Sequence, residues 1–289
     1  MNKKGQLMRI AVTGATGQLG GHVINYLLEK GIAPSDIVAV VRDDSKAAGL
    51  AEKGINLGVA SYEYEAALTA ALEGVDRLVL VSGSEVGKRF AQHTNIVNAA
   101  KAAGVTFIAY TSLLNAGTSE LGLAPEHRDT EKLLAESGID HAILRNGWYW
   151  ENYASAIDSG KAAGKFFGAA GTAKVSGAAR KDYAEAAAVV VTTDGHAGKT
   201  YELAGHPALT YPEIAAEVST VIGSEVTYVN QSVEEYQKVL EGAGMPVEVA
   251  AMFAGMEPII EGGALYNEST DLQDLIGHPS TSLSEALSA

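Results

Sequence analysis

The 289-residue sequence contains no cysteine. This absence excludes disulfide bonds, thiolate metal sites, a cysteine nucleophile and C-x-x-C redox chemistry. Histidine is also sparse, because the seven histidines are scattered and none forms an i, i+4 pair or an H-E-x-x-H motif. The sequence therefore shows no ligand set for a metal ion, and catalysis must come from other groups.

Long apolar runs and an excess of basic charge are missing as well. The best apolar run, residues 184–191, is far shorter than the ~18 residues that a membrane span needs. The opening MNKKGQLM lacks the apolar region of a secretory signal, so we expect a disordered extension up to about Leu7, with Met8 as an alternative start, and a cytoplasmic protein. The net charge of −14 argues against a nucleic-acid partner, whose phosphates require a basic face.

Glycine, in contrast, is abundant, and in the first half of the chain it recurs at the expected boundaries between helices and strands. Five glycines each end a helical stripe just before a β-branched residue that opens an apolar strand: Gly31, Gly54, Gly74, Gly104 and Gly138. The strands expected from this pattern include residues 37–41, 78–81, 107–110 and 141–144. Because these strands are almost continuously apolar, they are typical of a parallel sheet covered on both faces. The sequence therefore predicts an α/β fold with a doubly wound parallel sheet and a smaller C-terminal lobe.

The first strand leads into the most informative stretch, RIAVTGATGQLGG at residues 9–21. Its glycines, Gly14, Gly17 and Gly20, allow a sharp turn, a close approach of backbone amides to a pyrophosphate, and close packing of the following helix on the strand. A glycine triplet alone is weak evidence, but an apolar helical stripe follows it here, which favours a dinucleotide site. The residues expected at the phosphates are Gly14, Ala15, Thr16, Gly17, Gln18 and Leu19, with the hydroxyls of Thr13 and Thr16 as candidates for further donors.

The second strand ends at Val41, where a dinucleotide fold meets the adenosine ribose. Arg42 follows directly, and Lys46 lies one helical turn further on. An arginine at this point accommodates the 2′-phosphate of NADP, so we expect NADPH to be preferred. The alternative is that Arg42 is a solvated strand end and that Asp43 binds the ribose.

Two later strands end in small or hydroxyl-bearing residues, at the edge where ligands lie in open α/β sheets. We expect Ser82, Gly83 and Ser84 to pass under the cofactor, and Tyr110, Thr111 and Ser112 to lie beside the nicotinamide. A serine hydrolase is a competing idea, but Gly83-Ser84-Glu85-Val86-Gly87 places its serine wrongly for the G-x-S-x-G motif.

Both tryptophans of the chain fall in ILRNGWYWENY, residues 143–153. We expect Asn146, Gly147, Trp148, Tyr149 and Trp150 to bind a planar substrate, since aromatic rings after a strand end form a flat apolar wall. Hinge packing between two lobes explains the same rings, and both interpretations stay open. Arg180 either faces a cleft between the two lobes or is a surface charge.

The domain boundaries follow from these strands and from a Gly- and Ala-rich texture that begins near Ser155. We expect residues 8–147 to form the dinucleotide-binding domain, with its sheet completed by residues 181–205. Residues 148–180 and 206–289 then form the smaller lobe, which we expect to be mostly short helices. Those helices are expected to begin at Thr210 and Ser232, to span 247–261, and to begin again at Ser282.

The sequence resembles the NmrA-like branch of the atypical short-chain dehydrogenases. The resemblance lies in the segments GATGQLGG, IVAVVRD, VSGSEVG, AYTSLLNAG, EHRDTEK and LRNGWYWENY. Within that branch it is most similar to bacterial NADPH:quinone oxidoreductases, with triphenylmethane dye reductases as relatives. The resemblance covers essentially the whole chain from Met8. It implies an NADPH-binding first domain and a quinone or other planar acceptor in the cleft beside a small C-terminal lobe.

The chain departs from the wider dehydrogenase family at the Tyr-x-x-x-Lys pair, which normally lies on the helix after the fifth strand. Here that helix reads EHRDTEK, so His127 is the stand-in for the tyrosine and Glu131 occupies the place of the lysine. His127 is therefore a candidate general acid, with a plain helix residue as the alternative.

We expect hydride to pass directly from NADPH to a quinone held against Tyr149, with no flavin and no metal, because the chain has one dinucleotide motif and a quinone is already a strong two-electron acceptor. The alternative is a non-catalytic redox sensor of the NmrA type that binds NADP and signals to a protein partner. The oligomeric state stays open, with a homodimer among the options.

Overall fold

The computed structural model describes residues 8–288, so the expected N-terminal extension lies outside the described residues. These residues form two compact units. The first holds the chain up to Ala116, Leu123–Asn146 and Arg180–Tyr201; the second holds Gly117–Gly122, Gly147–Ala179 and the chain from Glu202 onward.

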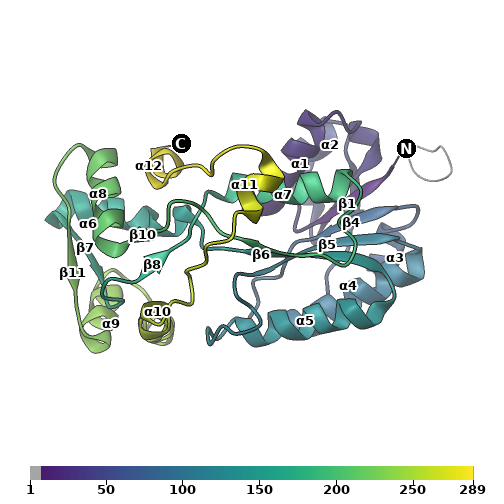
Figure 1. The fold of residues 1–289 in the computed structure, drawn as a ribbon. Helices are drawn as coiled ribbons and strands as arrows, with labels where there is room; N and C mark the ends of the chain where they lie inside the picture. The colour runs from purple at the N-terminus through teal and green to yellow at the C-terminus, as the bar shows by residue number, and fades with distance from the viewer. Residues whose placement is uncertain (1–7, 289) are drawn as a thin grey trace. The chain divides into compact units, whose positions relative to one another are not determined.

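The first unit is built on a seven-stranded parallel sheet with the strand order β3-β2-β1-β4-β5-β6-β9 (Figure 1). The strands are β1 (Ile10–Thr13), β2 (Ile37–Val41), β3 (Asn56–Val59), β4 (Arg77–Leu80), β5 (Phe107–Leu113), β6 (Asp140–Asn146) and β9 (Thr200–Leu203). Every residue of β1, β2 and β5 is buried, as expected for strands covered on both faces. The doubly wound α/β fold predicted from the glycine pattern is confirmed.

Helices cover both faces of this sheet: α1 (Gln18–Glu29), α2 (Ala48–Glu52), α3 (Glu65–Ala71), α4 (Arg89–Ala103), α5 (Ala124–Ser137) and α7 (Arg180–Thr192), with the short turns η1 (Pro34–Asp36) and η2 (Asp44–Lys46). Figure 1 shows α1 and α7 on one face and α3, α4 and α5 on the other. The five glycines at these expected boundaries all have φ between +73° and +82°. They therefore adopt the left-handed conformation that the sequence predicted for helix ends.

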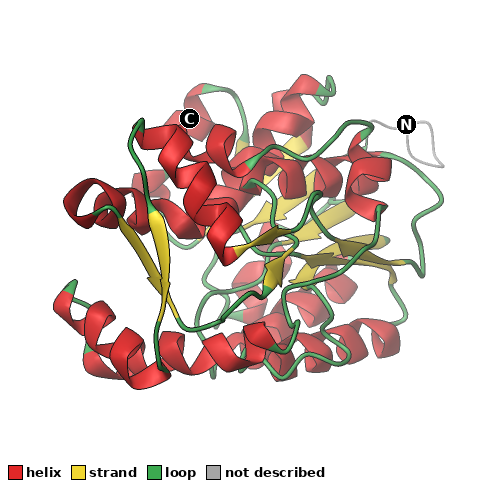
Figure 2. Ribbon diagram, turned by 60° about the vertical axis from the view of Figure 1, so that its left-hand side comes forward, coloured by secondary structure: helices red, strands yellow, loops and turns green. Residues whose placement is uncertain are grey.

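The second unit combines small strands and helices around its own interior (Figure 2). Its elements are η3 (Trp150–Tyr153), α6 (Ala154–Ala163), β7 (Lys165–Gly168), β8 (Lys174–Val175), β10 (Leu209–Thr210), α8 (Tyr211–Ile222), β11 (Thr227–Asn230), α9 (Val233–Gly242), α10 (Val247–Glu261), α11 (Asp271–Ile276) and α12 (Leu283–Ser288). Capping boxes at Thr210 and Ser232 start α8 and α9 where the sequence predicted. The parallel pair β7–β11 and the antiparallel pair β8–β10 were not predicted.

A carboxylate lies inside this second unit. Glu257 of α10 is only 6% exposed and accepts hydrogen bonds from the Ala169 backbone N–H at 2.6 Å and from the Tyr211 hydroxyl at 3.1 Å. Burial raises the pKa of the Glu257 carboxyl above its usual value, although these two hydrogen bonds favour the charged form. Glu257 therefore ties α10 to the residues after β7 and to α8.

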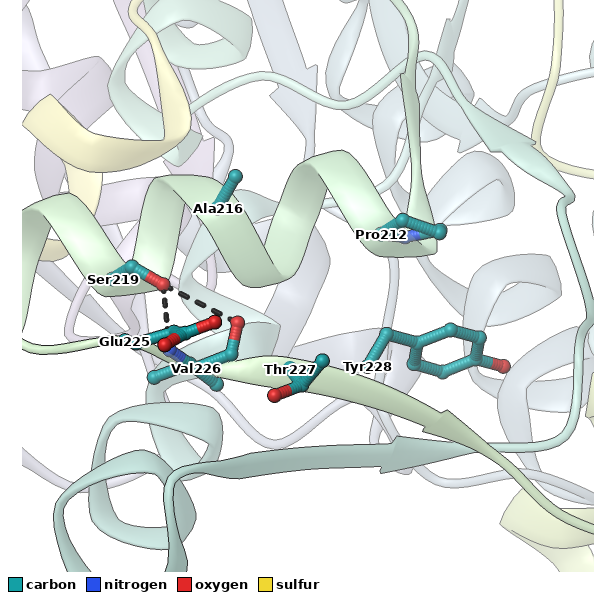
Figure 3. Close-up of a pocket in the computed structure, with 7 residues that line it drawn as sticks. All are labelled: Pro212, Ala216, Ser219, Glu225, Val226, Thr227 and Tyr228. Carbon is teal, nitrogen blue, oxygen red and sulfur yellow. Dashed lines mark hydrogen bonds between the residues drawn. The ribbon is translucent and has the colours of Figure 1, made fainter.

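A surface hollow in the second unit lies between α8 and β11 (Figure 3). It is lined by Pro212, Ala216, Ser219, Glu225, Val226, Thr227 and Tyr228. The Ser219 hydroxyl accepts the Val226 N–H at 2.8 Å and donates to the Val226 carbonyl at 3.3 Å, which closes one end. Since its only charged lining residue is an acid, this hollow does not suit an anionic dinucleotide.

Candidate functional site

The glycine loop joins β1 to α1 in the first unit. Gly14 has φ +59°, and its carbonyl accepts the Gly17 N–H at 2.8 Å, so the loop closes on itself before the helix begins at Gln18. A Cβ on Gly17 would lie 3.1 Å from that carbonyl, and a Cβ on Gly20 would collide with it. Thr16, Gly17 and Gln18 are exposed. The loop therefore presents backbone amides at a helix N-terminus, which is an arrangement that binds phosphate.

One expectation for this loop is wrong. The Thr13 hydroxyl is fully buried, accepts the Val81 N–H at 2.9 Å and donates to the Val81 carbonyl at 3.3 Å. It therefore bonds the end of β4 and is not available to a phosphate. The Tyr62 hydroxyl also lies close to the glycine loop, since a Cβ on Gly14 would be 3.5 Å from it. Burial raises the pKa of Tyr62 to about 12.

Hydroxyl groups also connect the next two strand ends. β4 pairs with β1, and the Ser82 N–H, just after β4, donates to Thr111 Oγ1 of β5 at 2.9 Å. Together with the Thr13–Val81 bonds, this contact links the carboxyl ends of β1, β4 and β5. The structure thus brings the glycine loop, Ser82 and Thr111 to one continuous edge, as expected for ligand sites in α/β sheets.

Arg42 and Lys46 follow β2 and are exposed. Arg42 Nη1 lies 3.5 Å from Glu85 Oε1, and Lys46 ends η2. Asp43 instead caps η2, since its carboxylate accepts the Ser45 N–H at 2.8 Å and the Ser45 hydroxyl at 2.7 Å. These bonds lower the pKa of Asp43, and each carboxylate oxygen keeps a further lone pair, so the alternative that Asp43 binds the ribose stays open.

Tyr110 of β5 and His127 of α5 form a buried pair. The Tyr110 hydroxyl lies 2.7 Å from His127 Nδ1, and the His127 side chain is 6% exposed. Burial, together with the charge of Arg89 and the nearby His93, lowers the pKa of His127 to about 3. The imidazole is therefore neutral at physiological pH, so it enters any proton transfer as a hydrogen-bonding group and not as a cation.

Glu131, in the place of the family's lysine, forms an ion pair with Arg145 of β6. The two side chains make a bidentate contact, with Arg145 Nε 3.0 Å from Oε1 and Nη2 2.7 Å from Oε2. The Ser112 hydroxyl donates to Oε1 at 2.6 Å. This position therefore carries a neutralised carboxylate, which joins β5, α5 and β6.

Sequence reasoning missed three residues near Gly83. The Gly83 N–H donates to His93 Nε2 at 3.0 Å, and its carbonyl accepts from Arg89 Nε at 2.6 Å. Arg89 is paired in turn with Glu126 at 3.1 Å. The available signal was the spacing of Arg89 and His93 on one face of α4, a face where an amphipathic helix carries apolar side chains.

The expected substrate residues fall into different environments. Asn146 ends β6 in the first unit, is 3% exposed, and neither atom of its amide has a hydrogen-bond partner among residues 8–288. Gly147, whose N–H donates to the Leu203 carbonyl at 3.0 Å, begins a segment of the second unit. Arg180, the first residue of α7, is half-buried.

The aromatic residues of the second unit also differ from one another. Trp150 is 2% exposed, and a Cβ on Gly177 would lie 2.6 Å from its ring, so packing explains this ring. Trp148 and Tyr149 are half-buried, and Tyr149 forms a β-bridge with Ala178. Trp148 and Tyr149 are therefore the rings of this cluster that keep a surface for a ligand.

Comparison with known proteins identifies the family. The sequence model of the NmrA-like family matches residues 6–285. The chain belongs to the NmrA-like family. This NmrA-like chain is 52% identical to quinone oxidoreductase 2 of Escherichia coli over 96% of its own length and 97% of that protein. It is also 31% identical to an NAD(P)H azoreductase of Xenophilus azovorans, over 83% of each chain.

Solved structures of similar proteins have the same fold. The crystal structure of the NADPH-dependent quinone oxidoreductase of E. coli in complex with NADPH matches with a TM-score of 0.92, covering 96% of this chain and 98% of that one. The triphenylmethane reductase of Citrobacter sp. in complex with NADP(H) matches with a TM-score of 0.92 at 37% identity, covering 96% and 98%.

Within residues 8–288, His, Asp and Glu side chains do not gather in any group of three that would hold a metal ion. No helix in the described part of the chain has both the length and the apolar character needed to cross a bilayer.

Proposed function

We propose that this NmrA-like protein is an NADPH-dependent oxidoreductase that transfers hydride from NADPH to a quinone or a similar planar acceptor. The observation that carries the proposal is its full-length similarity, at 52% identity, to the quinone oxidoreductase that was crystallised with NADPH. The glycine loop supports it independently, because it leads into a helix N-terminus and its glycines place no Cβ between the backbone and a pyrophosphate.

The cofactor residues we propose are those that the sequence predicted. The loop from Gly14 to Leu19 would hold the pyrophosphate, and Arg42 with Lys46 would hold the 2′-phosphate. Ser82, Gly83 and Ser84 would support the cofactor from the end of β4, with Tyr110, Thr111 and Ser112 in the second half of β5. The bound cofactor supplies a hydride at the nicotinamide C4 position.

For the acceptor we propose residues that the sequence predicted, among them Asn146 in the first unit and Trp148 and Tyr149 in the second. A buried amide without partners costs free energy that a ligand carbonyl or amide recovers by bonding to it. The half-buried rings offer a flat surface for stacking. We keep Gly147, Trp150 and Arg180 as proposed neighbours of the acceptor, with Trp150 acting through packing.

We further propose direct hydride transfer without flavin or metal, with protonation assisted by His127. Because the His127 imidazole is neutral, its role would be to donate a hydrogen bond or to relay a proton together with Tyr110. Reduction of a quinone makes few demands on acid catalysis, so the main work of the protein is to align two rings.

The decisive experiment is NADPH oxidation with a panel of quinones, using protein shown by its absorbance spectrum to contain no flavin. We expect turnover, with label passing from C4 of the nicotinamide once exchange of the hydroquinone hydroxyl protons is allowed for. Turnover that begins only when FMN or FAD is added would reject direct transfer. Tight NADPH binding without any turnover would favour a redox sensor, and unchanged turnover in Tyr149→Ala would remove Tyr149 from the site.

Coenzyme preference gives a second prediction. We expect Arg42→Asp to weaken NADPH binding by about 10- to 100-fold, equivalent to ~1.5–3 kcal/mol for a lost charge-assisted contact, and to leave NADH binding unchanged or improved. Titration of both coenzymes measures this. Lys53→Asp, which makes the same charge change at another exposed position, is the control. If Arg42→Asp and Lys53→Asp alter NADPH affinity equally, then Arg42 does not read the 2′-phosphate.

A cytoplasmic location and the absence of a nucleic-acid partner remain predictions from the sequence, and the oligomeric state stays open, with a homodimer among the options. Cell fractionation tests the first. Light scattering at several protein concentrations tests the dimer, and filter binding with duplex DNA tests the absence of a nucleic-acid partner.

A further inference from the structure

The first two turns of α4 bury polar side chains where the rest of the helix buries apolar ones. Arg89, Gln92 and His93 are 4%, 6% and 0% exposed. Ile96 and Val97 continue the same face in the next turn and are also buried. Because burying polar groups costs free energy unless they are hydrogen-bonded, this end of the helix must be matched to specific partners.

One series of hydrogen bonds fixes the orientation and tautomer of His93. The Thr130 hydroxyl donates to the Glu126 carbonyl at 2.8 Å, so its oxygen is left to accept from His93 Nδ1–H at 3.0 Å. His93 Nε2 then carries no proton and accepts the Gly83 N–H at 3.0 Å. Burial and the charge of Arg89 lower the pKa of His93 to about 3, which is consistent with this neutral form.

The carbonyl of Gly83 is bound by a charged side chain. Arg89 Nε donates to the Gly83 carbonyl at 2.6 Å, and Arg89 Nη1 contacts Glu126 at 3.1 Å. Glu126 also accepts the Gly87 N–H at 3.2 Å. A Cβ on Gly83 would lie 3.1 Å from Gln92 Oε1, so the helix approaches the backbone closely at this residue.

These contacts converge on the strand end that adjoins the glycine loop, since Val81 bonds Thr13 and Ser82 bonds Thr111. Stability alone does not require this arrangement, because well-packed apolar residues often replace a buried ion pair without loss. We infer that His93 and Arg89 form a clamp that positions the Ser82-Gly83-Ser84 turn for contact with the dinucleotide. His93 is then a positioning residue, acting through Gly83, and this inference rests on the proposed function.

The test compares four variants of the full-length protein. His93→Phe keeps an aromatic ring but removes both hydrogen bonds, whereas His93→Gln keeps an acceptor at the place of Nε2. Thr130→Val removes the acceptor for Nδ1–H. Thr94→Val is the matched control, because its hydroxyl donates to the Phe90 carbonyl at 2.9 Å on an exposed part of the same helix. Each variant is measured for NADPH Kd by fluorescence titration, for Tm, and for kcat and KM with a quinone.

We expect His93→Phe to raise the NADPH Kd by about 10- to 100-fold, as loss of a buried polar contact predicts. His93→Gln should return the Kd to within about threefold of wild type, and Thr130→Val should raise it by about three- to tenfold. The kcat at saturating NADPH should change by less than the Kd does in His93→Phe and Thr130→Val, and by less than about twofold in Thr94→Val, since the clamp acts on cofactor binding.

The clamp would be overturned if the His93 and Thr130 variants lowered Tm and kcat but left the NADPH Kd unchanged. It would also be overturned if Thr130→Val and Thr94→Val had the same NADPH Kd. If His93→Phe does not fold, His93→Gln and Thr130→Val still decide the question through Kd. If wild type binds NADPH but reduces no quinone, the proposed function fails while the clamp is still judged on binding alone.

Discussion

Gly20→Ala is expected to abolish NADPH binding, while Gly21→Ala leaves it intact. A Cβ on Gly20 would lie 2.8 Å from the Gly14 carbonyl carbon and 3.1 Å from the Ala15 Cα, both of which are backbone atoms that cannot rotate away. The loop must then move off the N-terminus of α1, which removes the aligned amides. A loss of at least about 100-fold in affinity is expected, because several charge-assisted bonds are broken together.

Gly21 is the matched control because it lies one residue further along the same helix. Its added Cβ would meet only the Ala15 carbonyl oxygen, at 3.8 Å, an ordinary van der Waals contact. Alanine is favoured over glycine within a helix by about 0.5–1 kcal/mol, so Gly21→Ala should raise Tm slightly. Equal NADPH affinities in the two variants, measured on folded protein, would show that the loop does not bind the pyrophosphate.

The second large effect is expected in the other unit. Glu257→Ala should lower the free energy of unfolding by about 3–5 kcal/mol, since it leaves the Ala169 N–H and the Tyr211 hydroxyl without this acceptor and opens a cavity. Glu257→Gln keeps an oxygen acceptor of nearly the same shape and should lose much less. Urea denaturation at several pH values measures both. A loss of under about 1 kcal/mol in Glu257→Ala would contradict this role.

The pH dependence follows from the raised pKa of the Glu257 carboxyl. Its usual value is 4.5, and in the folded protein the proton is held more tightly. The stabilisation from this group is therefore fully present below pH 4.5 and is lost as the pH rises through the folded-state pKa. The free energy of unfolding of wild type should therefore fall relative to that of Glu257→Gln as the pH rises from 4.5 through the folded-state pKa. A difference between the two that stays constant from pH 4 to pH 8 would show that burial does not disfavour the charged carboxylate.

Local patterns explain what the sequence allowed us to predict. The glycines before each strand act within a few residues of themselves, so Gly104 and Gly138 could be placed at helix ends without any tertiary information. The turn after β1 is equally local. Its partners are not, and this is why Thr13 was misassigned: its hydroxyl bonds Val81, which is 68 residues away in the sequence.

The clamp at Gly83 was missed for the same reason. His93 and Thr130 are separated by 37 residues, and no local pattern in the sequence indicates that they meet. The strands β7 and β11 were missed because four-residue strands carry little periodic signal, although Thr227–Asn230 is rich in residues that favour strands. The aromatic cluster could be located from sequence, but the division between a buried Trp150 and half-buried Trp148 and Tyr149 depends on what packs beneath each ring.

The bidentate pair of Arg145 with Glu131 bears on chemoselectivity. The resemblance to the wider dehydrogenase family implies a lysine at this point, on the same helix as a tyrosine that gives a proton to a carbonyl. Here the same point carries a carboxylate whose charge is already compensated, and the Ser112 hydroxyl is directed to it. If the proposed function holds, we expect substrates to be selected by their own reduction potential, so that simple aldehydes and ketones stay unreduced while acceptors of varied shape that accept hydride readily are reduced.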